Sequence, residues 1–154
     1  MAQRIPVLRT LPAAYDAYKS FADTVQKAAA NAGVDTLLVQ LVKIRASQLN
    51  GCAYCLDMHT AEALRAGETQ RRLFVLDGWR EAGLFTEQEC AALELTEVLT
   101  GLPHTRELPD DVYERATAVF TEDQYAAVVW LIVVINGWNR MTVAGHSPLP
   151  RRAG

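Results

Sequence analysis

The chain has 154 residues, of which 50% are hydrophobic, and its formal net charge is −3. This size suits a single domain over residues 1–154 that buries its core without disulfides or metal ions. The basic residues are scattered, which argues against a nucleic-acid partner. The first residues lack a signal-peptide pattern, and the most apolar run, residues 125–138, is shorter than a typical membrane span. We therefore expect a cytoplasmic protein with no membrane segment.

Apolar residues recur at three- and four-residue spacing along most of the chain, and no segment alternates convincingly with a period of two. An all-α fold is therefore predicted. Caps and breakers indicate where the helices begin and end. The predicted helices cover residues 10–33 with Thr10 as cap, 35–50, 52–67, 68–83, 86–99, 110–120, and 121 onward through INGWNR at 135–140. Residues 101–109 are predicted to be a loop and residues 147–154 a frayed tail.

The first and last of these helices show which faces should be buried. The last contains the apolar run 125–138 and is expected to be a central core or interface helix. The first has an apolar stripe that should face the core, made by Tyr15, Tyr18, Phe21, Ala22 and Val25.

The most informative stretch is NGCAYCLDMH at residues 50–59, which holds two of the three cysteines and one of the three histidines. The pair Asn50-Gly51 should end one helix, so the CxxC begins the next. On a helix, Cys52 and Cys55 lie on one face and His59 lies one turn beyond Cys55, so the three side chains converge. Cysteines at this spacing can close a local disulfide with little backbone movement.

The position of the cysteines favours redox chemistry. A helix N-terminus carries partial positive charge and free amide donors, which lowers the pKa of a thiol below its usual value of about 8.5 and favours the reactive thiolate. His59 can accept the proton of Cys55 or stay beside it as imidazolium. In a reducing cytoplasm, a close cysteine pair is more often catalytic or redox-active than a permanent crosslink.

The motif is also consistent with a zinc site or with an inert packed cluster. Its cysteines and histidine would supply three zinc ligands, with a fourth from Cys90, His104, His146 or water, although structural zinc sites usually bring their ligands in two paired knuckles. As an inert cluster, the same side chains would simply pack in the core. Cys90 most simply packs in the core, with a resolving thiol as the alternative, and both His104 and His146 are expected at the surface.

The segment LVKIRASQLNGCAYCLDMHTAEA at residues 41–63 closely resembles the core of the AhpD-like alkylhydroperoxidases, within the carboxymuconolactone decarboxylase superfamily. The resemblance includes the lead-in KIRASQLNGC, the CxxCxxxH motif and the small-residue continuation. The segment INGWNR also resembles the closing helix of that family, so the similar region extends from about residue 12 to residue 144. The resemblance implies an AhpD-like helical bundle that assembles into trimers or hexamers.

The resemblance also implies that the cysteine pair reduces hydroperoxides through a thiol and disulfide cycle. Carried over to this chain, Cys55 attacks the peroxide and becomes a sulfenic acid, Cys52 condenses with it, and His59 handles the proton. The thioredoxin-like precedent would instead favour Cys52, the residue nearer the helix end, as nucleophile. The order of attack therefore stays open.

The chain departs from the family pattern at two positions. The family often has a glutamate twelve residues before the first cysteine, as part of a proton relay with the motif histidine. This chain has Gln40 there, which can orient His59 by a hydrogen bond but cannot act as a base. Better-studied members can carry a histidine between the cysteines, where this chain has Tyr54, a poor base near neutral pH. We expect slower peroxidase chemistry, or a different preferred substrate.

Together these features predict an antioxidant thiol peroxidase that needs no metal or organic cofactor. Its reductant would be an external dithiol, such as a lipoyl or thioredoxin-like protein. The alternatives are a redox sensor that forms the disulfide without turnover, a zinc-stabilised module, and a carboxymuconolactone decarboxylase-like lyase. The lyase is the weaker option, because lactone decarboxylation does not need a dithiol.

Overall fold

The structure is a computed structural model that describes residues 2–150. Within that range all regular secondary structure is helical, which confirms the predicted all-α fold. The helices are, in chain order, α1 (Val7–Thr10), α2 (Pro12–Asn31), α3 (Thr36–Asn50), α4 (Ala53–Arg65), α5 (Gln70–Phe74), the 3-10 turn η1 (Leu76–Gly78), α6 (Trp79–Ala82), α7 (Glu87–Thr100), α8 (Leu102–Thr105), α9 (Asp110–Val119) and α10 (Glu122–Gly145).

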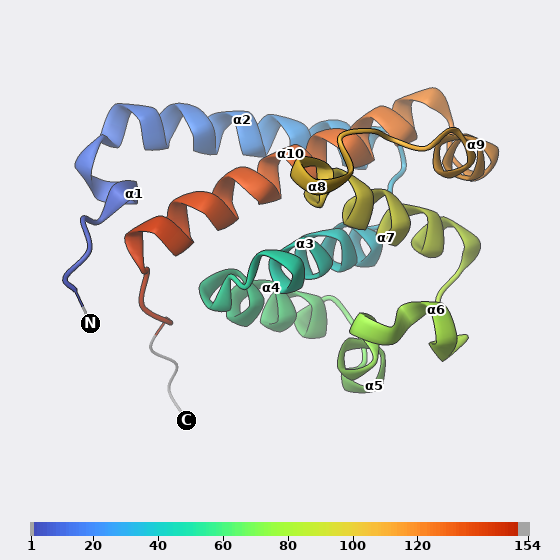
Figure 1. Cartoon of the computed structure of the whole chain (residues 1–154), viewed down its shortest axis with the longest axis horizontal. Helices are drawn as coiled ribbons and strands as arrows, with labels where there is room; N and C mark the ends of the chain where they lie inside the picture. The colour runs from blue at the N-terminus through green and yellow to red at the C-terminus, as the bar shows by residue number, and fades with distance from the viewer. Residues whose placement is uncertain (1, 151–154) are drawn as a thin grey trace.

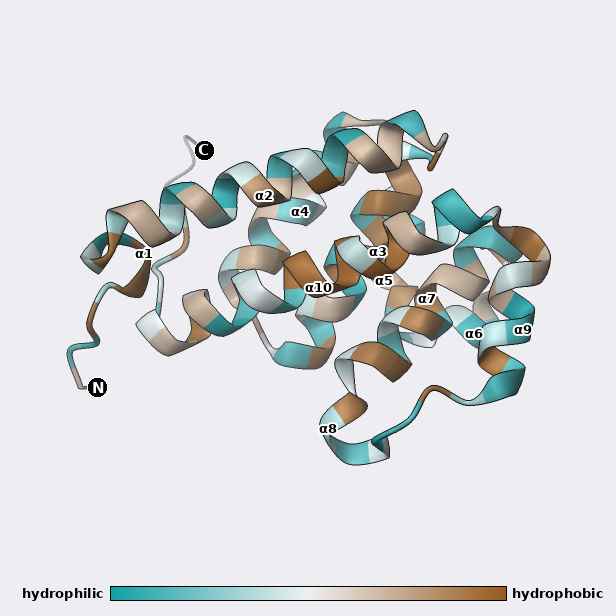
Figure 2. Cartoon of the chain, turned by 90° about the horizontal axis from the view of Figure 1, so that it is seen from above, coloured by the Kyte–Doolittle hydropathy of each residue, from teal (hydrophilic) through white to brown (hydrophobic). Residues whose placement is uncertain are grey.

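The two longest helices, α2 and α10, pack against each other along one side of the molecule, and α10 also packs on α3 and α7 (Figure 1). Helix α4 lies against α3, and α9 lies against α7. The most hydrophobic ribbon segments include the middle of α3 and α10 (Figure 2). One large apolar cluster joins α2, α3, α7, α9 and α10, and a smaller one joins α3, α4, α6 and α7.

Helix α10 is the central helix of the bundle, as the apolar run 125–138 predicted. Among residues 2–150, it is the helix that is long and apolar enough to cross a membrane by length and composition. A buried core helix passes the same test, and α10 also buries the polar side chains of Asn139 and Thr142 inside the protein. We therefore assign α10 to the core.

Several predicted helix boundaries are confirmed. The Asp35 carboxylate caps α3 by accepting the N–H groups of Leu37 and Leu38 at 2.8 and 3.3 Å. Gly51 ends α3 in the left-handed conformation with φ of 65°, which a glycine adopts without strain. The predicted capping boxes at the starts of α7 and α10 are both present. The turn that precedes the CxxC motif is therefore set by the sequence itself.

Three predictions about secondary structure were wrong. Thr10 does not cap the long N-terminal helix: it ends the short α1, and its hydroxyl donates to the Pro6 carbonyl at 3.0 Å. Helix α2 instead begins at Pro12, whose fixed φ suits a first helical position. The predicted loop 101–109 contains the short α8, because Pro103 also suits a first turn.

The third error is the single helix predicted over residues 68–83. The structure has α5, η1 and α6 there. The breaks let Leu76 and Trp79 both enter the smaller apolar cluster, while Asp77 reaches the buried guanidinium of Arg45. Tertiary packing therefore overrides the helical pattern in this segment. Of the predicted frayed tail, residues 147–150 form no helix, and residues 151–154 lie outside the described residues.

Candidate dithiol active site

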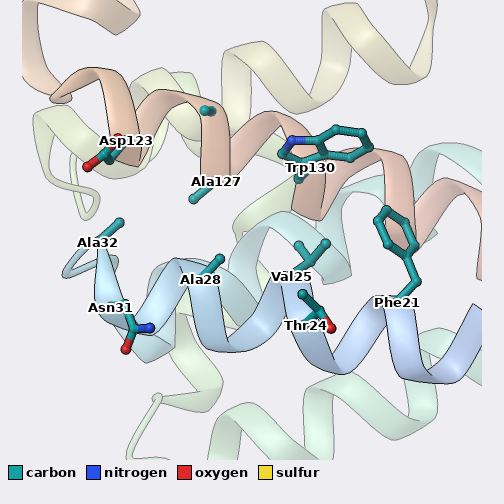
Figure 3. A pocket seen from close by; sticks show the side chains of 10 residues that line it. Phe21, Thr24, Val25, Ala28, Asn31, Ala32, Asp123, Ala127 and Trp130 are labelled. Atoms are coloured by element: carbon teal, nitrogen blue, oxygen red, sulfur yellow. The ribbon is translucent and has the colours of Figure 1, made fainter.

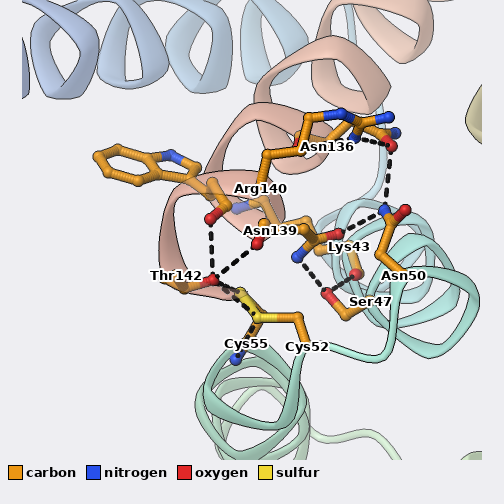
Figure 4. The surroundings of a disulfide bond; sticks show 10 residues. Lys43, Ser47, Asn50, Cys52, Cys55, Asn136, Asn139, Arg140 and Thr142 are labelled. Atoms are coloured by element: carbon orange, nitrogen blue, oxygen red, sulfur yellow. Dashed lines mark hydrogen bonds between the residues drawn. A yellow bond between two sulfur atoms is a disulfide. The ribbon is translucent and has the colours of Figure 1, made fainter. Parts of the chain in front are cut away.

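The two cysteines lie at the N-terminus of α4. Cys52 is the N-cap residue, and its sulfur accepts the N–H of Cys55 at 3.3 Å. The two side chains form a disulfide, with their Cα atoms 5.4 Å apart (Figure 4). Both residues are only 1% exposed. The motif therefore places a buried sulfur pair where the helix dipole and free amide donors favour negative charge on sulfur.

Thr142 of α10 is the polar side chain that faces both sulfurs. Its hydroxyl oxygen lies 2.9 Å from Cys52 Sγ and 3.5 Å from Cys55 Sγ (Figure 4). The same hydroxyl can donate to the Trp138 carbonyl at 2.9 Å, one turn earlier on α10. When the disulfide is reduced, this hydroxyl can accept from a thiol or turn and donate to a thiolate.

A network of amide side chains holds α10 against the end of α3. Asn139 Nδ2 donates to Ser47 Oγ at 3.0 Å, and Asn50 Nδ2 donates to Asn139 Oδ1 at 2.9 Å and to Asn136 Oδ1 at 3.0 Å. These asparagines belong to the INGWNR segment and to the turn before Cys52 (Figure 4). Because buried polar groups are costly to separate once paired, the network fixes the distance between α10 and the cysteines.

His59 is buried one turn below Cys55 and is held by a carboxylate. Its Nδ1 lies 3.0 Å from Glu62 Oε2, and Gln40 Nε2 donates to the same oxygen at 3.3 Å. Since an ionised carboxylate only accepts, Nδ1 carries the proton and Nε2 is left free to accept one. Gln40 therefore reaches His59 through Glu62, and not by the direct hydrogen bond that the sequence suggested.

Burial and charge set the protonation states of this group. Burial lowers the pKa of His59 below its usual value of 6.5, and the hydrogen bond with Glu62 offsets part of that effect. The hydrogen bond with His59 lowers the pKa of Glu62, and the charge of Lys43 acts in the same direction. Burial also lowers the pKa of Lys43. At neutral pH, the site therefore holds an ionised Glu62 beside a neutral imidazole.

A cavity of about 440 Å³ leads to the sulfurs and is bounded mainly by α2, α3, α4 and α10. Cys55 and His59 line it, whereas Cys52 does not. Tyr54, the residue between the cysteines, is half-buried in its wall. The aliphatic and aromatic part of the wall comes from Leu8, Tyr15, Met58, Leu131, Val134, Ile135 and Trp138. A ligand in this cavity would meet a mostly apolar surface with one reactive end.

The other candidate residues lie away from this cavity. Cys90 is half-buried, packs on the smaller apolar cluster and donates to the Phe85 carbonyl at 3.7 Å. His104 on α8 and His146 at the end of α10 are both exposed, as expected. Among residues 2–150, no group of three or more His, Cys, Asp or Glu side chains is placed to hold a metal ion. The zinc alternative therefore lacks a set of three protein ligands in the described part of the chain.

A second cavity, of about 490 Å³, lies between α2 and the first half of α10 (Figure 3). Small side chains such as Ala28 of α2 and Ala127 of α10 point toward each other across it, and Phe21 and Trp130 lie at one end. It is lined by no cysteine or histidine, so it does not belong to the dithiol site.

Sequence reasoning missed Glu62 and Thr142. Glu62 follows His59 by three residues on one helix, and this spacing alone predicts that their side chains meet. Thr142 is separated from Cys55 by 87 residues. No local pattern pairs them, since their contact depends on how α10 packs over α4.

Comparison with known proteins identifies the family and the fold of the chain. The model of the carboxymuconolactone decarboxylase family matches residues 12–98. The uncharacterized protein YdfG of Bacillus subtilis is 38% identical over 144 residues, which are 94% of this chain and 95% of that protein. A crystal structure of a protein of unknown function from Agrobacterium tumefaciens, described as a candidate AhpD antioxidant defence protein, has a TM-score of 0.89 at 32% identity and covers 98% of this chain and 100% of that one.

More distant structures share the fold alone. A variant of the debrominase Bmp8 in complex with 2,3,4-tribromopyrrole has a TM-score of 0.74 at 16% identity, covering 90% of this chain and 72% of that one. The family match, the fold and the CxxCxxxH motif lead to one assignment. The chain belongs to the carboxymuconolactone decarboxylase family and is an AhpD-like member of it.

Proposed function

We propose that this protein is an antioxidant thiol peroxidase that reduces hydroperoxides through the Cys52 and Cys55 pair. The observation that carries the proposal is the cavity that ends on Cys55 and His59, next to a second cysteine close enough to form a disulfide. An organic hydroperoxide has an apolar body and one polar reactive end, which suits a mostly apolar cavity of this kind.

In the first step, the Cys55 thiolate attacks the terminal oxygen of the hydroperoxide. An S–O bond forms, the O–O bond breaks, and the alkoxide leaves and takes up a proton to become an alcohol. The free Nε2 of His59 accepts the thiol proton and can return it to the alkoxide. The assignment of Cys55 as the attacking residue is supported by its position in the cavity wall, which Cys52 does not share.

In the second step, the Cys52 thiol attacks the sulfenic acid of Cys55, so that the S–S bond forms and water leaves. An external dithiol then reduces the disulfide by exchange and is itself oxidised. Because both cysteines are buried, the reductant has to enter the cavity. This favours a dithiol on a slender arm, such as a lipoyl group, over the broad surface of a thioredoxin-like protein.

We further propose that the protein works in the cytoplasm as a homo-oligomer, a trimer or a hexamer. Support within the chain comes from α10, where Trp130 and Val133 are 51% and 47% exposed although the opposite face of the helix is buried in the core. Exposed apolar side chains of this size commonly mark contacts between subunits.

The assignment of the attacking cysteine can be tested with single variants. In Cys52→Ser, a hydroperoxide should leave a sulfenic acid on Cys55, which mass spectrometry detects after trapping with dimedone. Cys55→Ser should lose the reaction, and Cys90→Ser is the matched control that should keep it. Retention of peroxidase activity by Cys55→Ser would contradict the roles proposed for the two residues.

A further inference from the structure

When His59 accepts the proton of the thiol, it becomes a positively charged imidazolium. A neighbouring group of opposite charge is needed to stabilise it. We propose that Glu62 is the carboxylate of the proton relay in this site, that Gln40 of α3 is a positioning residue that holds it, and that Lys43, in the same cavity wall, supplies an opposite charge. The inference rests on the proposed dithiol function and adds the residues that control proton transfer within it.

The hydrogen bonds assign different roles to Glu62 and Gln40. One oxygen of Glu62 receives both the Nδ1 proton of His59 at 3.0 Å and the Nε2 proton of Gln40 at 3.3 Å. The other end of the Gln40 amide, Oε1, is buried and has no hydrogen-bond partner among the described residues. Turning the amide round would place Oε1 against the carboxylate, so its orientation is determined by Glu62. Residue 40 thus donates to the relay carboxylate from the neighbouring helix.

Lys43 supplies a compensating charge. It lies one turn after Gln40 on α3, lines the same cavity as Glu62, and donates to Gln26 Oε1 at 2.9 Å. The charge of Glu62 opposes the effect of burial on the pKa of Lys43. A charge inside a protein is costly unless an opposite charge offsets it, so Lys43 and Glu62 each favour the ionised form of the other.

No other charged side chain in the cavity wall competes for Glu62. At the mouth of the cavity, Lys19 and Asp23 of α2 pair with each other at 2.9 Å and are both more than half exposed. The residues of α10 that line the cavity are uncharged. The protonation of His59 is therefore governed first by burial and then by Glu62 and Lys43, with the thiol of Cys55 nearby when the pair is reduced.

Glu62 raises the pKa of His59 and Lys43 lowers it, so variants of the two residues should shift this pKa in opposite directions. The pKa of the imidazole can be measured by NMR titration of the reduced protein. Glu62→Gln should lower the pKa of His59, because it removes a negative charge and a hydrogen bond, whereas Lys43→Met should raise it. The controls Glu81→Gln and Lys27→Met remove the same charges from exposed positions and should leave the titration unchanged.

The reaction rates of variants should show which residue is the carboxylate of the proton relay. We expect Glu62→Gln to slow the loss of thiols with an organic hydroperoxide by about tenfold or more. Gln40→Glu alone should give no gain, since it places a second negative charge beside Glu62. A faster reaction in Gln40→Glu, together with unchanged kinetics and an unchanged His59 pKa in Glu62→Gln, would overturn the inference. The NMR titration needs no peroxide, so it decides the inference even if the wild-type protein fails to reduce hydroperoxides.

Discussion

Replacing Thr142 by valine should make the thiols of the active site less acidic. The change keeps the shape of the side chain and removes the hydroxyl that lies 2.9 Å from Cys52 Sγ and 3.5 Å from Cys55 Sγ. In the reduced protein this hydroxyl is the α10 group that can donate to a thiolate. The backbone loses little, because the carbonyl of Trp138 is also part of the regular hydrogen bonding of α10.

The size of the effect follows from the hydrogen bond that is lost. A hydrogen bond to a charged group contributes about 1.5–3 kcal/mol. The lower figure applies here, because the Trp138 carbonyl competes for the same proton. Since one pKa unit corresponds to about 1.4 kcal/mol, the pKa of the more acidic thiol should rise by about one unit. At a pH below both values, the reaction with peroxide should then slow by about tenfold.

The measurement is the rate of alkylation of the reduced protein by iodoacetamide as a function of pH, followed by the rate of peroxide oxidation at one pH. Thr142→Ser keeps the hydroxyl and serves as the matched control. We expect the profile of Thr142→Val to move to higher pH and the profile of Thr142→Ser to stay near that of the wild type. Equal profiles for all three proteins, or an equal shift in both variants, would refute the reasoning.

Two further predictions concern stability. A Cβ atom on residue 137 would lie 2.7 Å from Tyr18 Cζ and would displace the Tyr18 hydroxyl from the Val134 carbonyl. Gly137→Ala should therefore lower the free energy of unfolding in urea by about 2–4 kcal/mol, and a loss under about 0.5 kcal/mol would contradict this contact. The second prediction uses His59, whose pKa is lower in the folded protein than its usual 6.5. Above pH 6.5, His59 is neutral in both the folded and the unfolded chain, so its contribution to stability is complete. This contribution is lost as the pH falls toward the pKa of His59 in the folded protein, because the unfolded chain binds the proton first. His59→Gln should flatten this loss between about pH 7 and pH 5, and an unchanged slope would exclude His59 as its source.

Local signals in the sequence predicted most of the helical framework. Asp35, Gly51, Thr86 and Thr121 each determine a helix end through contacts with residues a few positions away, so a single sequence is enough to find them. The buried face of α10 could be predicted for a similar reason, since its apolar run leaves little alternative to the core. The errors in α5, η1 and α6 arose where distant partners determine the local structure.

The difference between local signals and distant contacts also explains which residues of the site could be predicted from the sequence. The pairing of Cys52 with Cys55, and the place of Cys55 and His59 in one cavity wall, follow from positions on one helix. The role of Gln40 could not be predicted from its own position, because its partner Glu62 lies on another helix, 22 residues away. The position of the Thr142 hydroxyl beside the two sulfurs depends on the packing of α10 over α4, which the asparagine network stabilises. The sequence signals this network only as the isolated segment INGWNR.

The central claim is that the buried cysteine pair is a dithiol tuned to react with hydroperoxides. The most direct test mixes reduced, metal-free protein with a small excess of an organic hydroperoxide and follows the loss of Cys52 and Cys55 by quenched thiol labelling and peptide mass. We predict rapid loss of both thiols, much faster than for free cysteine, with formation of the Cys52–Cys55 disulfide. Loss at the rate of free cysteine, or oxidation that leaves this pair reduced, would contradict the claim.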